Sequence, residues 1–194
     1  MKLTMDNNFY EDTILNLLER VSNLEKEIIK MKNGNKQSNI SSSNNYKQKT
    51  YSKNEVIEEL TNELSTWNMV VNKRSLKEGG GLLIYNSHNT PINVYFSISK
   101  NYATANNVVF SGWHTISEEK IEEFNSFIFI VQKEDELNYF VFSQNEMKNL
   151  IGLKTKDNKD VYHFYFAERS NGQTIDLRDN IVLKNNKNNW EILN

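Results

Sequence analysis

The sequence predicts an α/β chain of the α+β kind in three parts. These are an N-terminal coiled-coil helix (residues 1–32), a flexible linker (33–53) and a mixed β-sheet domain with flanking helices (54–194). Three observations predict this division. Apolar residues recur at heptad spacing in the first part, polar residues fill most of the second, and the third alternates β-rich runs with capped helical segments. The third part is long enough for one domain with its own core.

The first part carries apolar residues at unbroken heptad spacing, the pattern that a coiled coil buries. They are Ile14, Leu17, Val21, Leu24, Ile28 and Met31. β-Branched residues fall at the a positions and unbranched residues at d, which favours a parallel dimer. In that pairing Arg20 faces Glu25 of a second copy and Glu27 faces Lys32, and both pairs are attractive. The alternative is an amphipathic helix that packs on its own domain.

Residues 33–53 read NGNKQSNISSSNNYKQKTYSK, with one aliphatic residue and no acidic residue. Such a segment cannot bury enough apolar surface to offset its ordering entropy, so we expect a disordered linker. A flexible chain of this length spans about 25 Å on average. A helix on so loose a tether buries its apolar stripe most simply in a second copy, so we expect a homodimer.

Composition narrows the possible functions. No apolar run approaches the ~18 residues of a membrane span, and residues 1–12 lack the apolar centre of a signal peptide. We therefore expect a cytoplasmic protein without a membrane partner. Because the chain has no cysteine, it cannot form a disulfide, a thiolate metal site or a cysteine nucleophile.

Charge is unevenly divided along the chain. Residues 1–53 hold nine Lys or Arg against six acids, whereas residues 54–194 hold fourteen against nineteen. A negatively charged domain is not an obvious duplex-DNA binder, because phosphate neutralisation supplies most non-specific affinity. Any contact with nucleic acid therefore needs a local basic patch. The candidates are Lys47, Lys49 and Lys53 in the linker, continued by Lys73, Arg74 and Lys77.

The first half of the domain predicts a helix followed by an antiparallel meander. Ser52 and Glu55 form a capping box, and the apolar residues after them lie on one helical face. Strands are predicted over residues 67–71, 82–85 and 92–100. A glycine triplet at residues 79–81 and a turn at residues 89–91 separate these strands.

The second half predicts two short helices and further strands. A loop through Trp113 leads to a helix that Ser117 caps. Residues 127–131 and 139–142 are predicted strands joined through a polar stretch. A second capping box, Ser143 with Glu146, begins a helix that ends near residue 150. Residues 161–167 predict another strand, and residues 190–193 the last one.

From residue 79 to residue 150 the order of elements resembles a restriction-endonuclease-like domain of the PD-(D/E)XK superfamily. The stretches that carry the resemblance are GGGLLIYNSHNTPINVYFSISKNY, GWHTISEEKIEEF, FIFIV and YFVFSQNEM. In such domains a short strand beginning with Asp is followed by a hairpin, and then by a strand reading Glu or Gln, any residue, Lys. A helix and two more strands come next. The resemblance implies a nuclease scaffold.

The active-site positions depart from the pattern of that superfamily. Gly81 stands at the Asp position, Tyr95 at the acid and Ser97 at the lysine. None of them binds a hard cation as a carboxylate does. The resemblance therefore implies a nuclease scaffold without its metal site, and we assign no catalytic residue, no metal and no cofactor. The alternative is a magnesium-dependent nuclease whose acids have migrated to Glu78 or to residues 168–179.

The three histidines give no metal-ligand spacing. His88 falls in a predicted turn, and His163 has the opposite strand parity to Tyr162 and Phe164, so we expect both to face solvent. His114 next to Trp113 is a candidate recognition spot, both polar and aromatic.

One group of carboxylates follows the strand at residues 161–167. It comprises Glu168, Asp176 and Asp179, with Arg169 and Arg178 between them. The interpretation that we favour is a charged hairpin rim with compensating arginines. The alternative is a metal site or an acid and base pair.

Taken together, these features predict a recognition or regulatory protein without catalysis, dimerised by a coiled coil. Its expected partner is a protein or a nucleic acid of a DNA-processing system, or of a defence or anti-defence system. Two alternatives remain, the metal-dependent nuclease with migrated acids and a purely structural oligomerisation module.

Overall fold

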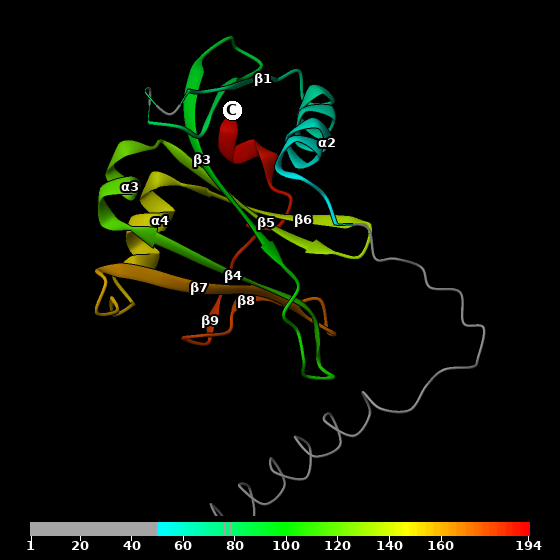
Figure 1. Cartoon of the computed structure of the whole chain (residues 1–194), viewed down its shortest axis with the longest axis vertical. Coiled ribbons are helices and arrows are strands. Elements are labelled where there is room, and N and C mark those ends of the chain that lie inside the picture. Colours follow the sequence, from blue (N-terminus) through cyan, green and yellow to red (C-terminus); the bar gives the residue numbers. More distant parts are fainter. Residues whose placement is uncertain (1–49, 76, 78) are drawn as a thin grey trace, which may run out of the picture. The chain divides into compact units, whose positions relative to one another are not determined.

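The computed structural model describes residues 50–75, 77 and 79–194. The predicted coiled coil, the linker up to residue 49 with Lys47 and Lys49, and the candidate acid Glu78 lie outside the described residues. Within the described part the fold is α+β, with three α-helices and two sheets (Figure 1). No helix in this part has the length and apolar character needed to span a membrane.

The first sheet has five strands in the order β1-β2-β3-β5-β6. Their bounds are β1 Val70–Lys73, β2 Leu82–Tyr85, β3 Pro91–Lys100, β5 Ser126–Lys133 and β6 Glu136–Ser143. β1, β2 and β3 form the predicted antiparallel meander, and β5 and β6 form an antiparallel hairpin. β3 and β5 are parallel, so the chain crosses over between them.

The second sheet has four antiparallel strands in the order β4-β7-β8-β9. They are β4 Val108–Ser117, β7 Val161–Arg169, β8 Thr174–Asp176 and β9 Ile181–Val182. In the chain, β4 lies between β3 and β5, which are neighbours in the first sheet. The segment that connects these two strands therefore contains the first strand of the second sheet.

The helices begin where the sequence predicts. α2 (Lys53–Ser65) has the complete capping box, because Ser52 N donates to Glu55 Oε2 (2.7 Å) and Glu55 N donates to Ser52 Oγ (3.3 Å). Ser117 caps α3 (Glu118–Glu123), and Ser143 with Glu146 caps α4 (Gln144–Ile151). The start of α2 at Lys53 falls inside the range that we assigned to the linker. Tyr51 also donates a hydrogen bond to Asp135 O (2.8 Å).

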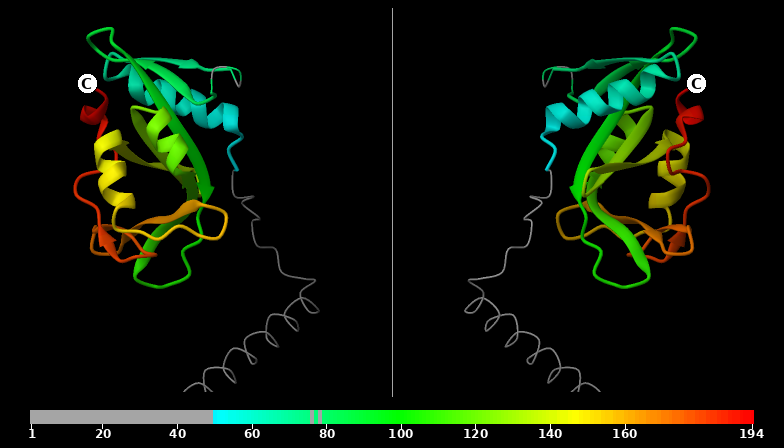
Figure 2. Two further views of the ribbon diagram at one scale, coloured as in Figure 1. Left: turned by 90° about the vertical axis from the view of Figure 1, so that its left-hand side faces the viewer. Right: turned by 90° about the vertical axis from the view of Figure 1, so that its right-hand side faces the viewer.

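Two apolar clusters hold the layers together. One lies between α2, the 3₁₀ helix η2 (Trp190–Leu193) and one face of the first sheet. The other lies between the opposite face of that sheet and the second sheet, with α3 and α4 closing its side. Figure 1 shows α2 and η2 above the first sheet and β7, β8 and β9 below it, and the side views in Figure 2 show the same layering.

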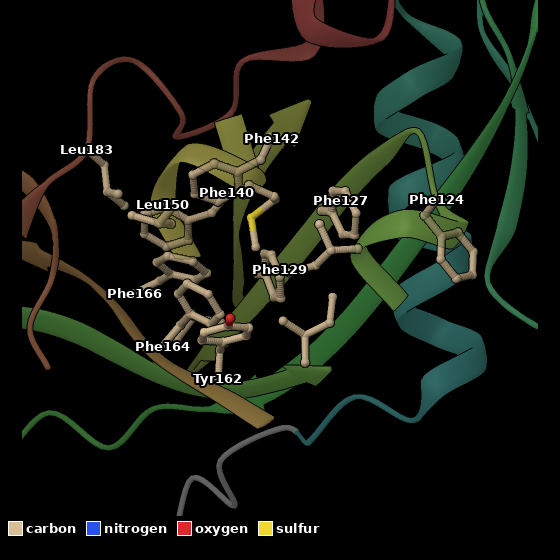
Figure 3. Close-up of a cluster of buried hydrophobic side chains, with 14 of the residues drawn as sticks. Phe124, Phe127, Phe129, Phe140, Phe142, Leu150, Tyr162, Phe164, Phe166 and Leu183 are labelled. Atoms are coloured by element: carbon tan, nitrogen blue, oxygen red, sulfur yellow. The ribbon is translucent and has the colours of Figure 1, made fainter. Parts of the chain in front are cut away.

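Aromatic rings dominate the cluster between the sheets (Figure 3). Phe129 lies at its centre, with ring centroids 5.0 Å from Phe166 and 5.9 Å from Phe142. Strand β5 is buried from Ser126 to Gln132, and its alternate side chains enter the two clusters. A fully buried apolar side chain of this size contributes about 1.5–3 kcal/mol. β5 therefore stabilises both clusters, and the neighbouring strand β6 does the same through Phe140 and Val141.

Three predicted elements differ from the structure. Trp113 lies in the ten-residue strand β4 and not in a loop. Residues 190–193 form the 3₁₀ helix η2 and not a strand, because Trp190 is buried and its Nε1 donates to Glu63 Oε1 (3.0 Å). The first strand begins at Val70 and not at residue 67, because Asn68 adopts a positive φ of 57° in the turn after α2.

Candidate functional site

The face of β3 that the nuclease resemblance assigns to chemistry packs against β4. Tyr95 Oη donates to Thr115 O (3.4 Å), Ser97 Oγ contacts His114 Nδ1 (3.0 Å), and Trp113 N donates to Ser99 Oγ (2.8 Å). These contacts hold the side chains between the two sheets. None of the three carries a negative charge for a metal ion, and burial raises the pKa of Tyr95.

Gly81 stands where the resemblance places an aspartate. Its φ is 78°, and a Cβ built there would lie 2.6 Å from both Val94 O and Phe124 Cε1. This backbone therefore accommodates only glycine. No carboxylate fits at this position without moving β3 or α3.

His114 is a core residue. Its side chain is 2% exposed, lies 5.1 Å from the ring of Phe129, and hydrogen-bonds only through Nδ1. Desolvation by burial lowers the pKa of His114 to about 3, so the ring is neutral at physiological pH. Adjacent residues of a strand point to opposite faces, so the structure separates the two residues that we grouped as a recognition spot. His114 points inward and Trp113 points outward.

Trp113 is 48% exposed on the outer face of the second sheet. Two residues of the neighbouring strand β7 accompany it there: Tyr165 is its register partner, and His163 is the register partner of Thr115. The indole lies nearly parallel to the His163 ring, with centroids 5.9 Å apart and planes at 13°, and the Tyr165 ring lies 6.4 Å away. We call Trp113, His163 and Tyr165 the aromatic face.

Hydrogen bonds fix this face in place. Trp113 Nε1 donates to His163 Nδ1 (3.0 Å), and His163 Nε2 lies 2.8 Å from Asp157 Oδ2. Because an indole N–H can only donate, Nδ1 accepts and the imidazole proton is on Nε2, from which it is donated to Asp157. Asp157 is itself held in a turn by the backbone N–H groups of Lys159 (2.8 Å) and Val161 (3.2 Å). The hydrogen bond from His163 is the main cause that lowers the pKa of Asp157 to about 2.

The charges next to the aromatic face are mostly negative. Lys154 is buried and pairs with Asp176 and Asp179, and its Nζ also donates to His163 O (3.0 Å). Lys156 pairs with Glu118 (2.7 Å) and Asp160 (3.1 Å). With Asp157, Lys159 and Arg178, this neighbourhood holds four basic side chains and five carboxylates. An anionic ligand would therefore meet a net repulsion here.

The carboxylates of residues 168–179 are paired with lysines. Glu168 pairs with Lys187, and Asp176 and Asp179 share Lys154, so Glu168 and Asp176 do not form one site. The compensating cations are lysines and not the predicted arginines. Arg169, for example, donates to Gln173 Oε1 (3.0 Å) and Asn180 Oδ1 (3.1 Å). Among the described residues no three His, Cys, Asp or Glu side chains are grouped closely enough to hold a metal ion.

The basic candidates lie in a different part of the fold. Lys53 Nζ lies 5.0 Å from the Phe96 ring, and Lys73 Nζ donates to Asn54 Oδ1 (2.9 Å), so both lysines lie at the start of α2. Arg74 lies over the Phe124 ring at 5.9 Å. Lys77 is in the loop between β1 and β2. The first sheet separates the lysines at α2 from the aromatic face, so the two sets do not form one surface.

Sequence reasoning found Trp113 but missed the neighbours that orient it. The alternation along residues 161–167 predicted that His163 faces outward, and the same alternation places Tyr165 beside it. The sequence did not predict the contact between Asp157 and His163 or the pairing of β4 with β7, because both depend on how separate segments of the chain pack together.

No family model matches this chain. No curated protein matches it either. A solved structure titled "Crystal Structure of MepB" aligns with a TM-score of 0.30 and 14% sequence identity, covering 58% of this chain and 79% of that chain. A similarity this remote supports no inference about fold or function.

Proposed function

We propose that this chain is a recognition protein that acts by binding, and that its aromatic face contacts a partner protein. The observation that carries the proposal is the 48% exposure of Trp113 on a face where its own hydrogen bond to His163 holds it still. Apolar surface gathered on one face of a monomer marks interaction sites, whereas singly scattered apolar residues do not. Trp113 lies beside the rings of His163 and Tyr165 on one face. Trp and Tyr are also the residues most enriched at the energetic centres of protein interfaces.

Preorganisation strengthens this interpretation. Ordering a free side chain on binding costs about 0.5–1.5 kcal/mol. Trp113 has already lost much of that freedom, because His163 accepts from its indole and Asp157 holds His163. A partner therefore binds an aromatic surface that is already ordered, as the centre of a protein interface requires.

The local charge favours a protein over nucleic acid. Proteins that bind single strands combine stacking rings with a positively charged groove. The neighbourhood of the aromatic face holds more carboxylates than lysines, and Lys53 and Lys73 lie on the α2 side of the first sheet. An arginine of a partner protein fits better, because its guanidinium stacks on indole and pairs with carboxylates.

The absence of catalysis is part of the proposal. Two observations support it. Tyr95, Ser97 and Ser99 pack against β4, and the backbone at Gly81 has no room for the side chain of an aspartate. The order of elements that the sequence predicts resembles that of a nuclease, and this resemblance is the reason to look for the partner among DNA-processing or defence proteins. A dimer formed through the predicted coiled coil would present two aromatic faces to such a partner and gain avidity.

The experiment compares the tagged full chain with Trp113→Ala and Trp67→Ala in capture from the source cells. Trp67 is a matched control, since it is 37% exposed at the end of α2. We expect a protein captured by the native chain and by Trp67→Ala, resistant to nuclease treatment of the lysate, and lost with Trp113→Ala. Equal capture by all three proteins, or capture that nuclease abolishes, would contradict the proposal.

A second measurement separates this function from the nuclease alternative. Magnesium or manganese should leave the melting temperature unchanged, whereas a surviving carboxylate site would raise it. Incubation with supercoiled and single-stranded DNA should leave both intact. Cleavage by the purified chain would replace the binding proposal with the nuclease.

A further inference from the structure

A pocket of about 450 Å³ lies between α4 and β9, apart from the aromatic face. Phe142, Leu150 and Leu183 are the buried apolar members of its lining, and all three belong to the apolar cluster between the sheets (Figure 3). We call it the α4–β9 pocket. Its volume falls in the range of about 300–1,000 Å³ that is typical of small-molecule sites.

The rim of this pocket exposes apolar surface to water. Leu153, just after α4, is 67% exposed, and Val182 in β9 is 50% exposed. A ligand with an apolar body would bury both side chains, and each buried Å² of apolar surface contributes about 25 cal/mol. The pocket therefore selects a ligand whose main part is hydrocarbon.

Two polar side chains in the lining are already satisfied. Glu146 Oε2 accepts from Ser143 N (2.8 Å) and Ser143 Oγ (2.8 Å), and Glu146 Oε1 accepts from Asn186 Nδ2 (3.2 Å). The same amide nitrogen of Asn186 also donates to Val141 O (3.0 Å). These groups have their partners within the fold and do not need a ligand.

Lys184 is different. It lines the pocket on its exposed side, and no carboxylate of the described residues pairs with it. Glu146, the other charged residue of the lining, accepts its hydrogen bonds from Ser143 and Asn186, so Lys184 is the charged group left for a ligand at the mouth. A ligand head with one negative charge would complement it, whereas a cationic head would be repelled.

We propose that the α4–β9 pocket binds a small amphipathic carboxylate, with its alkyl body between Leu150, Leu153 and Val182 and its carboxylate at Lys184. The apolar lining supplies most of the affinity, and Lys184 selects the charge of the head. This site is independent of the aromatic face, so either proposal can fail while the other holds.

The test titrates the full-length chain with decanoate, and with decanol as the uncharged analogue, by calorimetry. The native chain should bind one decanoate saturably and should bind decanol at least fivefold more weakly. Lys184→Gln should weaken decanoate at least fivefold and remove the difference between the two ligands. Val182→Trp should fill the pocket and abolish binding of both.

Two variants serve as matched controls. Lys159→Gln removes an exposed lysine elsewhere, and Val70→Trp adds an indole at an exposed position of β1. Both should bind decanoate as the native chain does, and circular dichroism should show that every variant is folded. No saturable decanoate binding by the native chain, or native affinity in Val182→Trp, would overturn the site. Equal affinity of the native chain for decanoate and decanol would overturn the role of Lys184.

Discussion

Trp113 Nε1 donates to His163 Nδ1 across 3.0 Å, and this hydrogen bond joins neighbouring strands of the second sheet through their side chains. It requires that His163 keep Nδ1 free of a proton. Asp157 favours the tautomer that meets this requirement, because its carboxylate accepts a hydrogen bond from Nε2–H, with the two heavy atoms 2.8 Å apart. The position of the most exposed tryptophan therefore depends on a carboxylate in a separate turn.

Replacing His163 should release Trp113. We expect His163→Ala to lower the free energy of unfolding by about 1–2 kcal/mol, because it removes a hydrogen bond to a charged group and one to the indole. Urea unfolding measures the stability, and tryptophan emission reports the altered surroundings of Trp113. His88→Ala, in an exposed turn, should change neither. An unchanged emission spectrum in His163→Ala would show that His163 does not hold the indole.

Asp157 should make the domain sensitive to strong acid. Its pKa is lowered from 3.8 to about 2 in the folded state, chiefly by His163. The unfolded state therefore takes up the proton first, and the stability that Asp157 supplies is complete above about pH 4 and lost as the pH falls towards 2. Asp157→Asn should be less stable than the native chain at pH 7, and this difference should shrink between pH 4 and pH 2. Urea unfolding across that range makes the comparison, and a constant difference would contradict it.

His114 should impose a second pH dependence, over a wider range. Burial lowers its pKa from 6.5 to about 3, so between these values the unfolded state binds a proton that the folded state excludes. As the pH falls below 6.5, each unit should therefore cost about 1.4 kcal/mol of stability until the folded ring is protonated. In His114→Phe, whose ring can pack beside Phe129 and Phe166, that slope should disappear. Thermal melts of both proteins from pH 7 to pH 4 test it, and parallel curves would exclude His114 as the cause.

The predicted coiled coil makes its own prediction about assembly. Leu24→Asp places a charge at a d position of the heptad, where a dimer would have to bury it. The native chain should sediment as a dimer at micromolar concentration, and Leu24→Asp should sediment as a monomer. Lys26→Asp also adds a negative charge, but at an outward f position, and should remain a dimer. A native monomer would disprove the coiled coil.

The sequence was informative wherever structure depends on neighbouring residues. The capping boxes of Ser52 and Ser143 are local hydrogen-bond patterns, and each helix begins where its cap predicts. The alternation along β7 also predicted correctly that His163 points away from the face of Tyr162 and Phe164. Each of these signals involves residues within a few positions of one another.

Features that depend on distant contacts could not be predicted in the same way. β4 contains Gly112, which is poorly suited to a strand, and the structure needs it because a Cβ there would lie 2.3 Å from Val131 Cγ2. The burial of His114 and the pairing of Lys154 with Asp176 likewise follow from the packing of one sheet on another. The predicted loop through Trp113 is the strand β4, which covers Tyr95 and Ser97, and this contact also joins distant segments.

The position of β4 in the chain determines whether the domain can be truncated. Because β4 is made between β3 and β5, neither sheet is encoded by an uninterrupted stretch of sequence. A fragment ending before residue 108 would lack β5, the parallel neighbour of β3. A fragment starting at residue 108 would expose Ile128 and Ile130 of β5, because their cluster includes residues of α2, β2 and β3. The two layers are thus inseparable by truncation, and residues 50–194 should melt in a single cooperative step.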